Sequence, residues 1–243
     1  MERKLADGVC FIEGVEDMFP DANVYVLGDP STEDLTLVDA GIVENGARKL
    51  ESMARLGLEI THIRRIIMTH THLDHIGCVP EIIRRIPDVE LWVHEVEAVS
   101  LERGDDRTLY GMSSMKDMIK SRFNFADDAF TGLSVQRRLL DGDSLELCGF
   151  TWEVIHIPGH SPGCIALYNS AGKILIPGDV IYADQAVGRF DLHGSDPEAH
   201  RASLHRLAGL EVEMLLPGHD RVMESVPGGY IEDTSRQWEP YIK

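Results

Sequence analysis

The chain has little positive charge and no long apolar run. Lys and Arg number 23 against 41 Asp and Glu, which gives a formal net charge of −18 at pH 7. A surface of this sign repels a phosphate backbone, so we expect no nucleic-acid partner. No stretch approaches the length of a membrane span, and Met1–Leu5 leads into no apolar segment of a signal peptide. We therefore expect neither a membrane partner nor secretion.

Cysteine is also scarce. The four cysteines are widely scattered and none lies in a CxxC pair: Cys10, Cys78, Cys148 and Cys164. In a chain of this size, that pattern is typical of reduced thiols inside a cell, and we expect a cytoplasmic protein. The 243 residues, 43% hydrophobic and 26% charged, are ordinary for a soluble protein and suffice to bury a large core.

Hydrophobic patterns predict an alternation of strands and helices. The predicted strands cover residues 8–13, 23–27, 35–38, 63–68, 91–94, 145–157, 165–169, 173–176 and 212–216. Helices are predicted over 45–56, 76–86 and 196–207, and the tail from Pro227 is rich in turn residues. The order shows no repeat and no linker. It predicts one α/β domain over residues 1–243, with two sheets packed together and helices outside both.

A helical insertion is expected at about 96–125. Its apolar residues recur at spacings near three and four: Tyr110, Met112, Met115, Met118, Ile119 and Phe123. Methionine adapts to varied shapes, so this segment would suit a lid over a substrate. The alternatives are a helix packed on the core of the chain, or an interface with a second copy in a homodimer.

Three imidazoles and a carboxylate follow the predicted strand 63–68 within six residues, at His70, His72, Asp74 and His75. These side chains are common ligands of zinc and similar divalent ions. In an extended segment, alternate side chains face the same way, so His70 and His72 should project together. A helix beginning near residue 76 would let Asp74 and His75 reach a neighbouring position. That arrangement leaves room for two metal ions.

Three further polar residues each follow a strand beside a glycine. They lie in the segments Pro158-Gly159-His160, Pro177-Gly178-Asp179 and Pro217-Gly218-His219. Glycine allows the backbone to turn sharply and to approach a bound group. Each side chain is therefore expected on a tight loop at the end of a strand, where a scaffold can hold a rigid metal site.

The HxHxDH motif at 70–75, followed in order by His160, Asp179 and His219, resembles the metallo-β-lactamase superfamily. The resemblance covers residues 39–219. It implies a four-layer αββα sandwich, in which two packed mixed β-sheets carry helices on both outer faces. It also implies two divalent metal ions, with Zn²⁺ as the first expectation and Fe or Mn as alternatives. The implied ligands are His70, His72 and His160 for one ion, Asp74, His75 and His219 for the other, and Asp179 as the bridge.

Two such ions lie roughly 3.5–4 Å apart and share a hydroxide whose parent water has a pKa near ~7. We expect this hydroxide to attack a carbonyl or phosphoryl group while the ions stabilise the negative charge that develops. Asp74 would also orient the nucleophile or help to move a proton. Asp39 would fix the orientation of a ligand, with a turn residue that caps the next helix as the alternative.

Residues around the motifs indicate which branch of the superfamily the chain resembles. The flavodiiron branch resembles HxExDH, whereas position 72 is His, so oxygen-reducing diiron chemistry is not expected. The segment Gly188-Arg189-Phe190-Asp191 is similar to the glyoxalase II-like branch, and we expect Arg189 and Asp191 to form a structural pair. Glyoxalase II binds glutathione with help from an added C-terminal domain, whereas 24 residues follow His219 here. The resemblance therefore implies thiolester chemistry and leaves open whether the thiol is glutathione.

Tyr182 lies three residues after Asp179 and resembles the tyrosine that polarises the substrate carbonyl in the lactonase branch. A buried, hydrogen-bonded tyrosine is the alternative. The predicted function is a metal-dependent hydrolase of a thiolester or lactone in a small substrate, with Asp74 and Tyr182 as catalytic residues. The alternative function is a persulfide dioxygenase of the same fold with a single iron ion.

Overall fold

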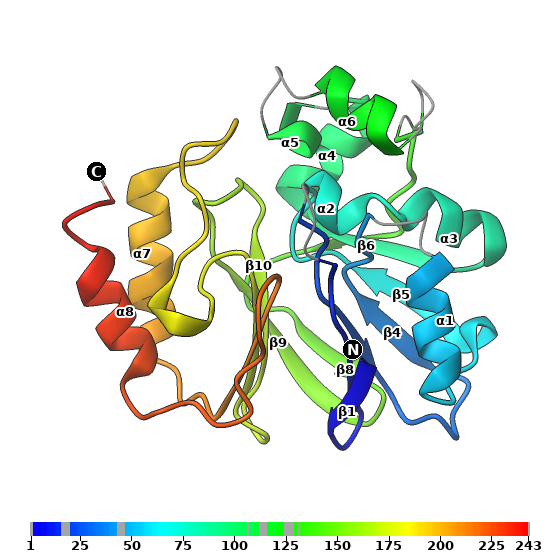
Figure 1. The fold of residues 1–243 in the computed structure, drawn as a ribbon, viewed down its shortest axis with the longest axis horizontal. Coiled ribbons are helices and arrows are strands. Elements are labelled where there is room, and N and C mark those ends of the chain that lie inside the picture. Colours follow the sequence, from blue (N-terminus) through cyan, green and yellow to red (C-terminus); the bar gives the residue numbers. More distant parts are fainter. Residues whose placement is uncertain are drawn as a thin grey trace.

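The computed structural model of the chain describes residues 2–15, 20–42, 47–105, 107–111, 116–123, 129–130 and 132–242. These residues form two mixed β-sheets with helices outside them (Figure 1). The first sheet has the order β1-β2-β3-β4-β5-β6-β7. Neighbouring strands are antiparallel from β1 to β4 and parallel from β4 to β7. Its strands are β1 Glu2–Ala6, β2 Val9–Ile12, β3 Val24–Leu27, β4 Leu35–Val38, β5 Ile63–Ile67, β6 Glu90–His94 and β7 Arg137–Leu139.

The second sheet has the order β12-β11-β10-β9-β8. Its strands are antiparallel to their neighbours except for the parallel pair β11 and β12. They are β8 Ser144–Leu147, β9 Phe150–His156, β10 Ile165–Asn169, β11 Ile174–Gly178 and β12 Met214–Pro217. Phe11, Tyr25 and Ile67 of the first sheet share one buried cluster with Trp152 and Leu167 of the second. The two sheets therefore pack face to face through apolar side chains.

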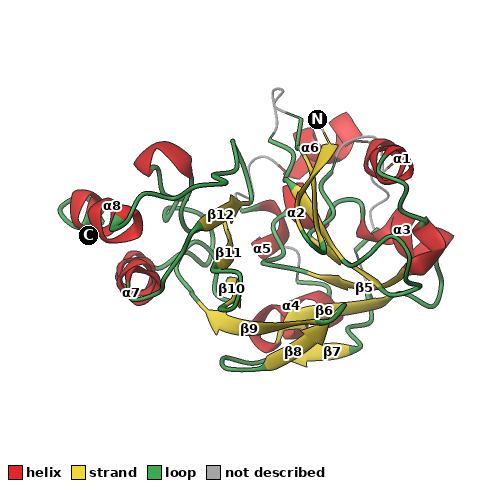
Figure 2. Cartoon of the chain, turned by 90° about the horizontal axis from the view of Figure 1, so that it is seen from below, coloured by secondary structure: helices red, strands yellow, loops and turns green. Residues whose placement is uncertain are grey.

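Helices cover both outer faces. On the first sheet lie α1 Ala47–Arg55, α3 Val79–Arg85 and α4 Glu95–Arg103, whose apolar residues join the cluster behind that sheet. On the second lie α7 Pro197–Ala208 and α8 Tyr230–Trp238. Viewed from below, α7 and α8 stand on one side of the sheets and α1 and α3 on the other (Figure 2). The predicted four-layer αββα sandwich is confirmed.

The structure corrects several predicted elements. The helix expected from residue 76 begins earlier, as the turn α2 Leu73–Ile76, and α3 follows after a break at Gly77 and Cys78. The tail expected to be turn-rich contains α8, because its apolar residues, among them Ile231, pack against the second sheet. Strands β1 and β7 at the edge of the first sheet were not predicted.

The helical segment predicted at about 96–125 is present as α4, α5 Arg107–Tyr110 and α6 Lys116–Phe123. Figure 1 shows α5 and α6 beyond α2, at the end of the sandwich. Met112 and Met115 lie outside the described residues, as does the side chain of Ile119. Of the helices that the structure describes, none combines the length and the apolar character needed to span a bilayer.

A buried ion pair holds the residues that lead directly into β3. Lys49 Nζ lies 3.0 Å from Asp21 Oδ2, and Lys49 also donates to the carbonyl oxygen of Ala22 at 2.8 Å. The amide of Ile42 donates to Asp21 Oδ1 at 2.8 Å. Next to the pair, the amide of Ala22 donates to the carbonyl oxygen of Asp74 at 3.1 Å. The ion pair therefore fixes α1 against a segment that contacts the HxHxDH loop.

We expect Lys49→Ala to lower the free energy of unfolding by ~3–5 kcal/mol, because the buried carboxylate of Asp21 loses its cation. Urea denaturation measures this change. Lys4→Ala is the matched control, since its ion pair with Asp7 is exposed and should contribute little. Equal unfolding midpoints for the two variants would contradict the stabilising role of the buried pair.

Candidate metal centre

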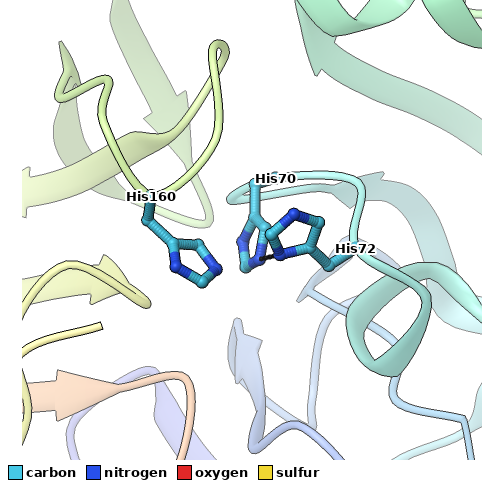
Figure 3. A group of neighbouring side chains, drawn as sticks. All are labelled: His70, His72 and His160. Carbon is cyan, nitrogen blue, oxygen red and sulfur yellow. Dashed lines mark hydrogen bonds between the residues drawn. The ribbon is translucent and has the colours of Figure 1, made fainter. Parts of the chain in front are cut away.

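The HxHxDH loop follows β5 and is held by the carboxylate of Asp39. Asp39 Oδ1 accepts from the amide of Thr69 at 2.8 Å, and Oδ2 accepts from the Thr69 hydroxyl at 2.8 Å. His72 itself is extended and is the N-cap of α2. His70 Nε2 and His72 Nδ1 lie 3.1 Å apart, so the two rings project together as the alternation predicts (Figure 3).

His160 completes a first group with His70 and His72. One ring nitrogen from each lies within 4.8 Å of the others, and all three residues are buried. The Nδ1 of His160 donates to the carbonyl oxygen of Arg189 at 2.7 Å, which leaves Nε2 as the nitrogen with a free lone pair. The Nε2 atoms of His72 and His160 are buried and have no hydrogen-bond partner among the described residues. Figure 3 shows the three rings turned toward one another.

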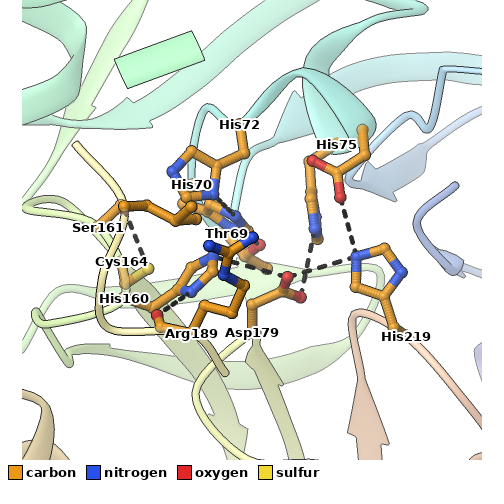
Figure 4. A network of polar contacts seen from close by, with 12 residues as sticks. Thr69, His70, His72, His75, His160, Ser161, Cys164, Asp179, Arg189 and His219 are labelled. Atoms are coloured by element: carbon orange, nitrogen blue, oxygen red, sulfur yellow. Dashed lines mark hydrogen bonds and ion pairs between the residues drawn. The ribbon is translucent and has the colours of Figure 1, made fainter. Parts of the chain in front are cut away.

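Asp74, His75, Asp179 and His219 form the second group, with ligand atoms also within 4.8 Å of one another. Because α2 begins at Leu73, Asp74 and His75 lie on a helical turn and not before it as predicted. His219 Nε2 is 3.1 Å from Asp74 Oδ2, and Figure 4 shows His75 and His219 turned toward Asp179. His75 Nδ1 donates to Asp39 Oδ2 at 2.9 Å, which directs its Nε2 toward the group. Asp39 thus contacts a candidate ligand, and in the part of the chain that the structure describes its side chain binds Thr69 and His75 and no helix end.

Asp179 belongs to the second group and also lies beside the first. Its Oδ2 is 3.3 Å from His219 Nε2 and 3.6 Å from His160 Nε2, while its Oδ1 is 3.2 Å from His75 Nε2. All seven residues predicted as ligands are therefore brought together. They come from loops at the carboxyl ends of β5, β9, β11 and β12, although the loops belong to two different sheets.

The two groups differ in their electrostatics. In the first, burial lowers the pKa of His72 to about 3 and also lowers the pKa values of His70 and His160. These imidazoles are neutral at pH 7 and offer lone pairs. In the second, burial alone would lower the pKa of His219, but the Asp179 and Asp74 carboxylates raise it to about 10.

The carboxylates of the second group are ionised. Burial alone would raise the pKa of Asp74, yet its hydrogen bond from His219 and the charge of His75 lower it to about 2. The buried carboxylate of Asp179 and the half-buried carboxylate of Asp74 require compensating positive charge, which a divalent cation supplies. Five imidazoles and two carboxylates that converge in this way fit a site for two metal ions.

A cavity of ≈ 260 Å³ opens onto both groups. Its wall is mostly apolar, and it includes Ile42, Leu73, Leu109, Tyr110 and Leu192. The helical segment 96–125 contributes α5 to this wall. The amide of His193 donates to the carbonyl oxygen of Gly111 at 2.7 Å, so the end of α5 is joined to the loop that carries Leu192.

Tyr182 lines the same cavity, and its ring lies 6.3 Å from the ring of His219. Burial and the neighbouring Asp179 carboxylate raise the pKa of Tyr182 well above its usual value, so the hydroxyl stays protonated. Arg189 and Asp191 form the predicted pair, with Nε 2.8 Å from Oδ1.

One residue of this region was not identified from the sequence. Glu97, in the first turn of α4, is 1% exposed and contacts the loops of both His72 and His160. Its sequence context, Glu95-Val96-Glu97, is that of an ordinary charged helix start. Only the fold distinguishes the buried Glu97 from the exposed Glu95.

The αββα sandwich and the two His/Asp groups at its edge define a class of metal-dependent hydrolases. The family model of the metallo-beta-lactamase superfamily matches residues 19–219. The chain belongs to this superfamily, and it is a metallo-hydrolase.

Three relatives illustrate the breadth of this likeness. The probable metallo-hydrolase YflN of Bacillus subtilis is 31% identical over 82% of this chain and 80% of its own length. Hydroxyacylglutathione hydrolase GloC of Haemophilus influenzae is 26% identical over 68% of this chain and 72% of its own length. Human acyl-coenzyme A thioesterase MBLAC2 is 32% identical over 63% of this chain, but this match spans only 54% of MBLAC2.

Solved structures are similar to this chain over most of its length. The di-iron-bound form of TTHA1623 has a TM-score of 0.66 and 29% identity, over 92% of this chain and 98% of its own. The B3 metallo-beta-lactamase BLEG-1 has a TM-score of 0.68 and 28% identity, over 88% of this chain and 93% of its own.

Gly218 provides a test of the close packing at the second group. A Cβ at this position would lie 2.1 Å from Asp179 Oδ1 and 2.8 Å from His75 Cε1. We expect Gly218→Ala to displace Asp179 and to lower the free energy of unfolding by ~1–3 kcal/mol. Thermal unfolding measures the loss. Gly228→Ala is the control, because a Cβ there meets no atom within 4 Å. If the two variants unfold alike, the Asp179 carboxylate is not confined as described.

Proposed function

We propose that the chain hydrolyses a thiolester of an apolar acyl group in a small substrate, using two divalent ions held by the seven converging His and Asp residues. The observation that carries this proposal is the mostly apolar cavity that opens directly onto both groups. An apolar wall would bind the acyl chain, and the polar groups would meet the bond to be cleaved.

The names of two relatives favour a thiolester. GloC is called a hydroxyacylglutathione hydrolase and MBLAC2 an acyl-coenzyme A thioesterase. The thiols in these names differ, whereas the bond is the same. We propose the bond as the common element and treat glutathione and coenzyme A as alternative carriers. A lactone is the second ester-like candidate, because Tyr182 lines the cavity as the lactonase resemblance implies.

Two divalent ions, when bound, acidify a water molecule to give a nucleophile at neutral pH and stabilise negative charge on the attacked carbonyl group. The side chains of the chain have separate tasks. The protonated Tyr182 hydroxyl is able to donate a hydrogen bond to the carbonyl oxygen of the substrate. Asp74, which lines the cavity beside His219, would orient the nucleophile or help to move its proton.

Metal analysis of protein purified without added metal or chelator tests the site, together with a panel of thiolesters and lactones. We expect close to two ions per chain and hydrolysis of a thiolester. His72→Ala should reduce this hydrolysis to background in a folded protein, because a neutral ligand of the first group is lost. One iron per chain together with oxygen uptake on a persulfide would replace the proposal with the dioxygenase. Full activity of His72→Ala would refute the ligand assignment.

Leu192 allows a test of the acyl-binding wall. It is only partly buried, so truncation should disturb the fold little. We expect Leu192→Ala to lower kcat/KM for a medium-length acyl thiolester by roughly 10-fold, and less for the acetyl thiolester, because apolar contact is lost. Leu140→Ala is the control, since Leu140 is 45% exposed and does not line the cavity. An equal effect of Leu192→Ala on acetyl and longer substrates would argue against this wall as the acyl site.

A further inference from the structure

A buried carboxylate joins the two loops that carry the first group of histidines. Glu97 Oε2 accepts from the amide of Thr71 at 2.6 Å. Glu97 Oε1 accepts from the amide of Gly163 at 3.0 Å and from the Ser161 hydroxyl. We infer that Glu97 is a positioning residue that sets the affinity of His70, His72 and His160 for their metal ion. This inference rests on the proposed function only in that it takes these three histidines to be a metal site.

The contacts of Glu97 lie next to every member of the first group. Thr71 stands between His70 and His72 in the sequence, and Ser161 follows His160 directly. The rings of His70 and His160 have centroids 4.9 Å apart, and those of His72 and His160 4.6 Å apart. Because the loops belong to different sheets, the distances between these rings depend on how the loops are joined. Glu97 joins them directly.

The three partners of Glu97 all donate. The amides of Thr71 and Gly163 can only donate, and the hydroxyl of Ser161 donates to Oε1 while lying 3.1 Å from Cys164 Sγ. A carboxylate can accept all three bonds at once. The isosteric amide of glutamine cannot, because its NH₂ group must face either the Thr71 amide or the Gly163 amide, donor against donor.

The methylene groups of the Glu97 side chain are held in place as well as its carboxylate. A Cβ on Gly163 would lie 2.7 Å from Glu97 Cγ and 3.1 Å from Cδ, so the side chain packs closely on the backbone of the His160 loop. On the same helix, Ala98 and Leu101 are buried in the cluster behind the first sheet. Glu97 therefore attaches both loops to α4, a helix that is itself anchored in the core. Outer contacts of this kind typically change metal affinity by 10–100-fold.

Glu97→Gln tests this inference in two backgrounds, the natural chain and His219→Ala. The second background weakens the other group, so the single remaining ion reports on His70, His72 and His160. The readout is the Zn²⁺ dissociation constant, from competition with a chromophoric chelator, with no measurement of activity. Glu95→Gln is the matched control, because it removes the same charge from the same helical turn at an exposed position.

We expect Glu97→Gln to raise the dissociation constant of the ion in the His219→Ala background by roughly 10–100-fold, and Glu95→Gln to leave it unchanged. In the natural chain, one of the two dissociation constants should rise. Equal constants for Glu97→Gln and Glu95→Gln would overturn the inference and leave the proposed function intact. A natural chain that binds no Zn²⁺ would overturn both.

Ser161→Ala serves if Glu97→Gln does not fold. It removes one of the three donors and keeps the carboxylate paired with two amides. We expect a smaller rise in the same dissociation constant. An unchanged constant in Ser161→Ala, measured in the His219→Ala background, would contradict a positioning role for this contact network.

Discussion

The burial of Asp179 is the constraint on which the rest of the site depends. Asp179 is 4% exposed, and histidines of both groups lie within 3.6 Å of its carboxylate. A buried anion is costly unless positive charge and hydrogen-bond donors surround it. Burial lowers the pKa of His72, whereas at His75 and His219 the neighbouring carboxylates, Asp179 first among them, outweigh burial and raise the pKa. The contrast in histidine pKa between the two groups therefore follows from where the carboxylates lie.

Asp39 connects the histidines around Asp179 to the end of β4. It adopts a φ of 61°, a left-handed conformation that is uncommon for a residue other than glycine. In this position its two oxygens reach Thr69 and His75, one at the start of the HxHxDH loop and one at its end. The strained backbone at the end of β4 is thus compensated by hydrogen bonds that shape the loop between them. The left-handed backbone of Asp39 is therefore what places its carboxylate to hold the HxHxDH loop.

The sequence predicted those parts of the site that local patterns encode. The HxHxDH spacing places His70 and His72 together because alternation in an extended segment is a local property, and the glycine turns locate His160, Asp179 and His219 at strand ends. The early start of α2 was missed because its N-cap, His72, makes no side-chain capping hydrogen bond, so no capping residue marks the start in the sequence. Glu97 was missed because its burial arises only when loops from two sheets meet at α4. Helix α8 was missed for a similar reason, since its packing partner is the second sheet.

The helical segment 96–125 links two properties that are usually treated separately. Its first helix, α4, supports the histidine loops through Glu97, and α5 supplies Leu109 and Tyr110 to the wall of the cavity. The ligand set is common to many chemistries on this fold, so it cannot by itself select a substrate. A segment that contacts both the ligand loops and the substrate cavity can vary in its wall residues while Glu97 stays fixed. Specificity would then change at α5 with little effect on the metal groups, because the two functions use different turns of the same segment.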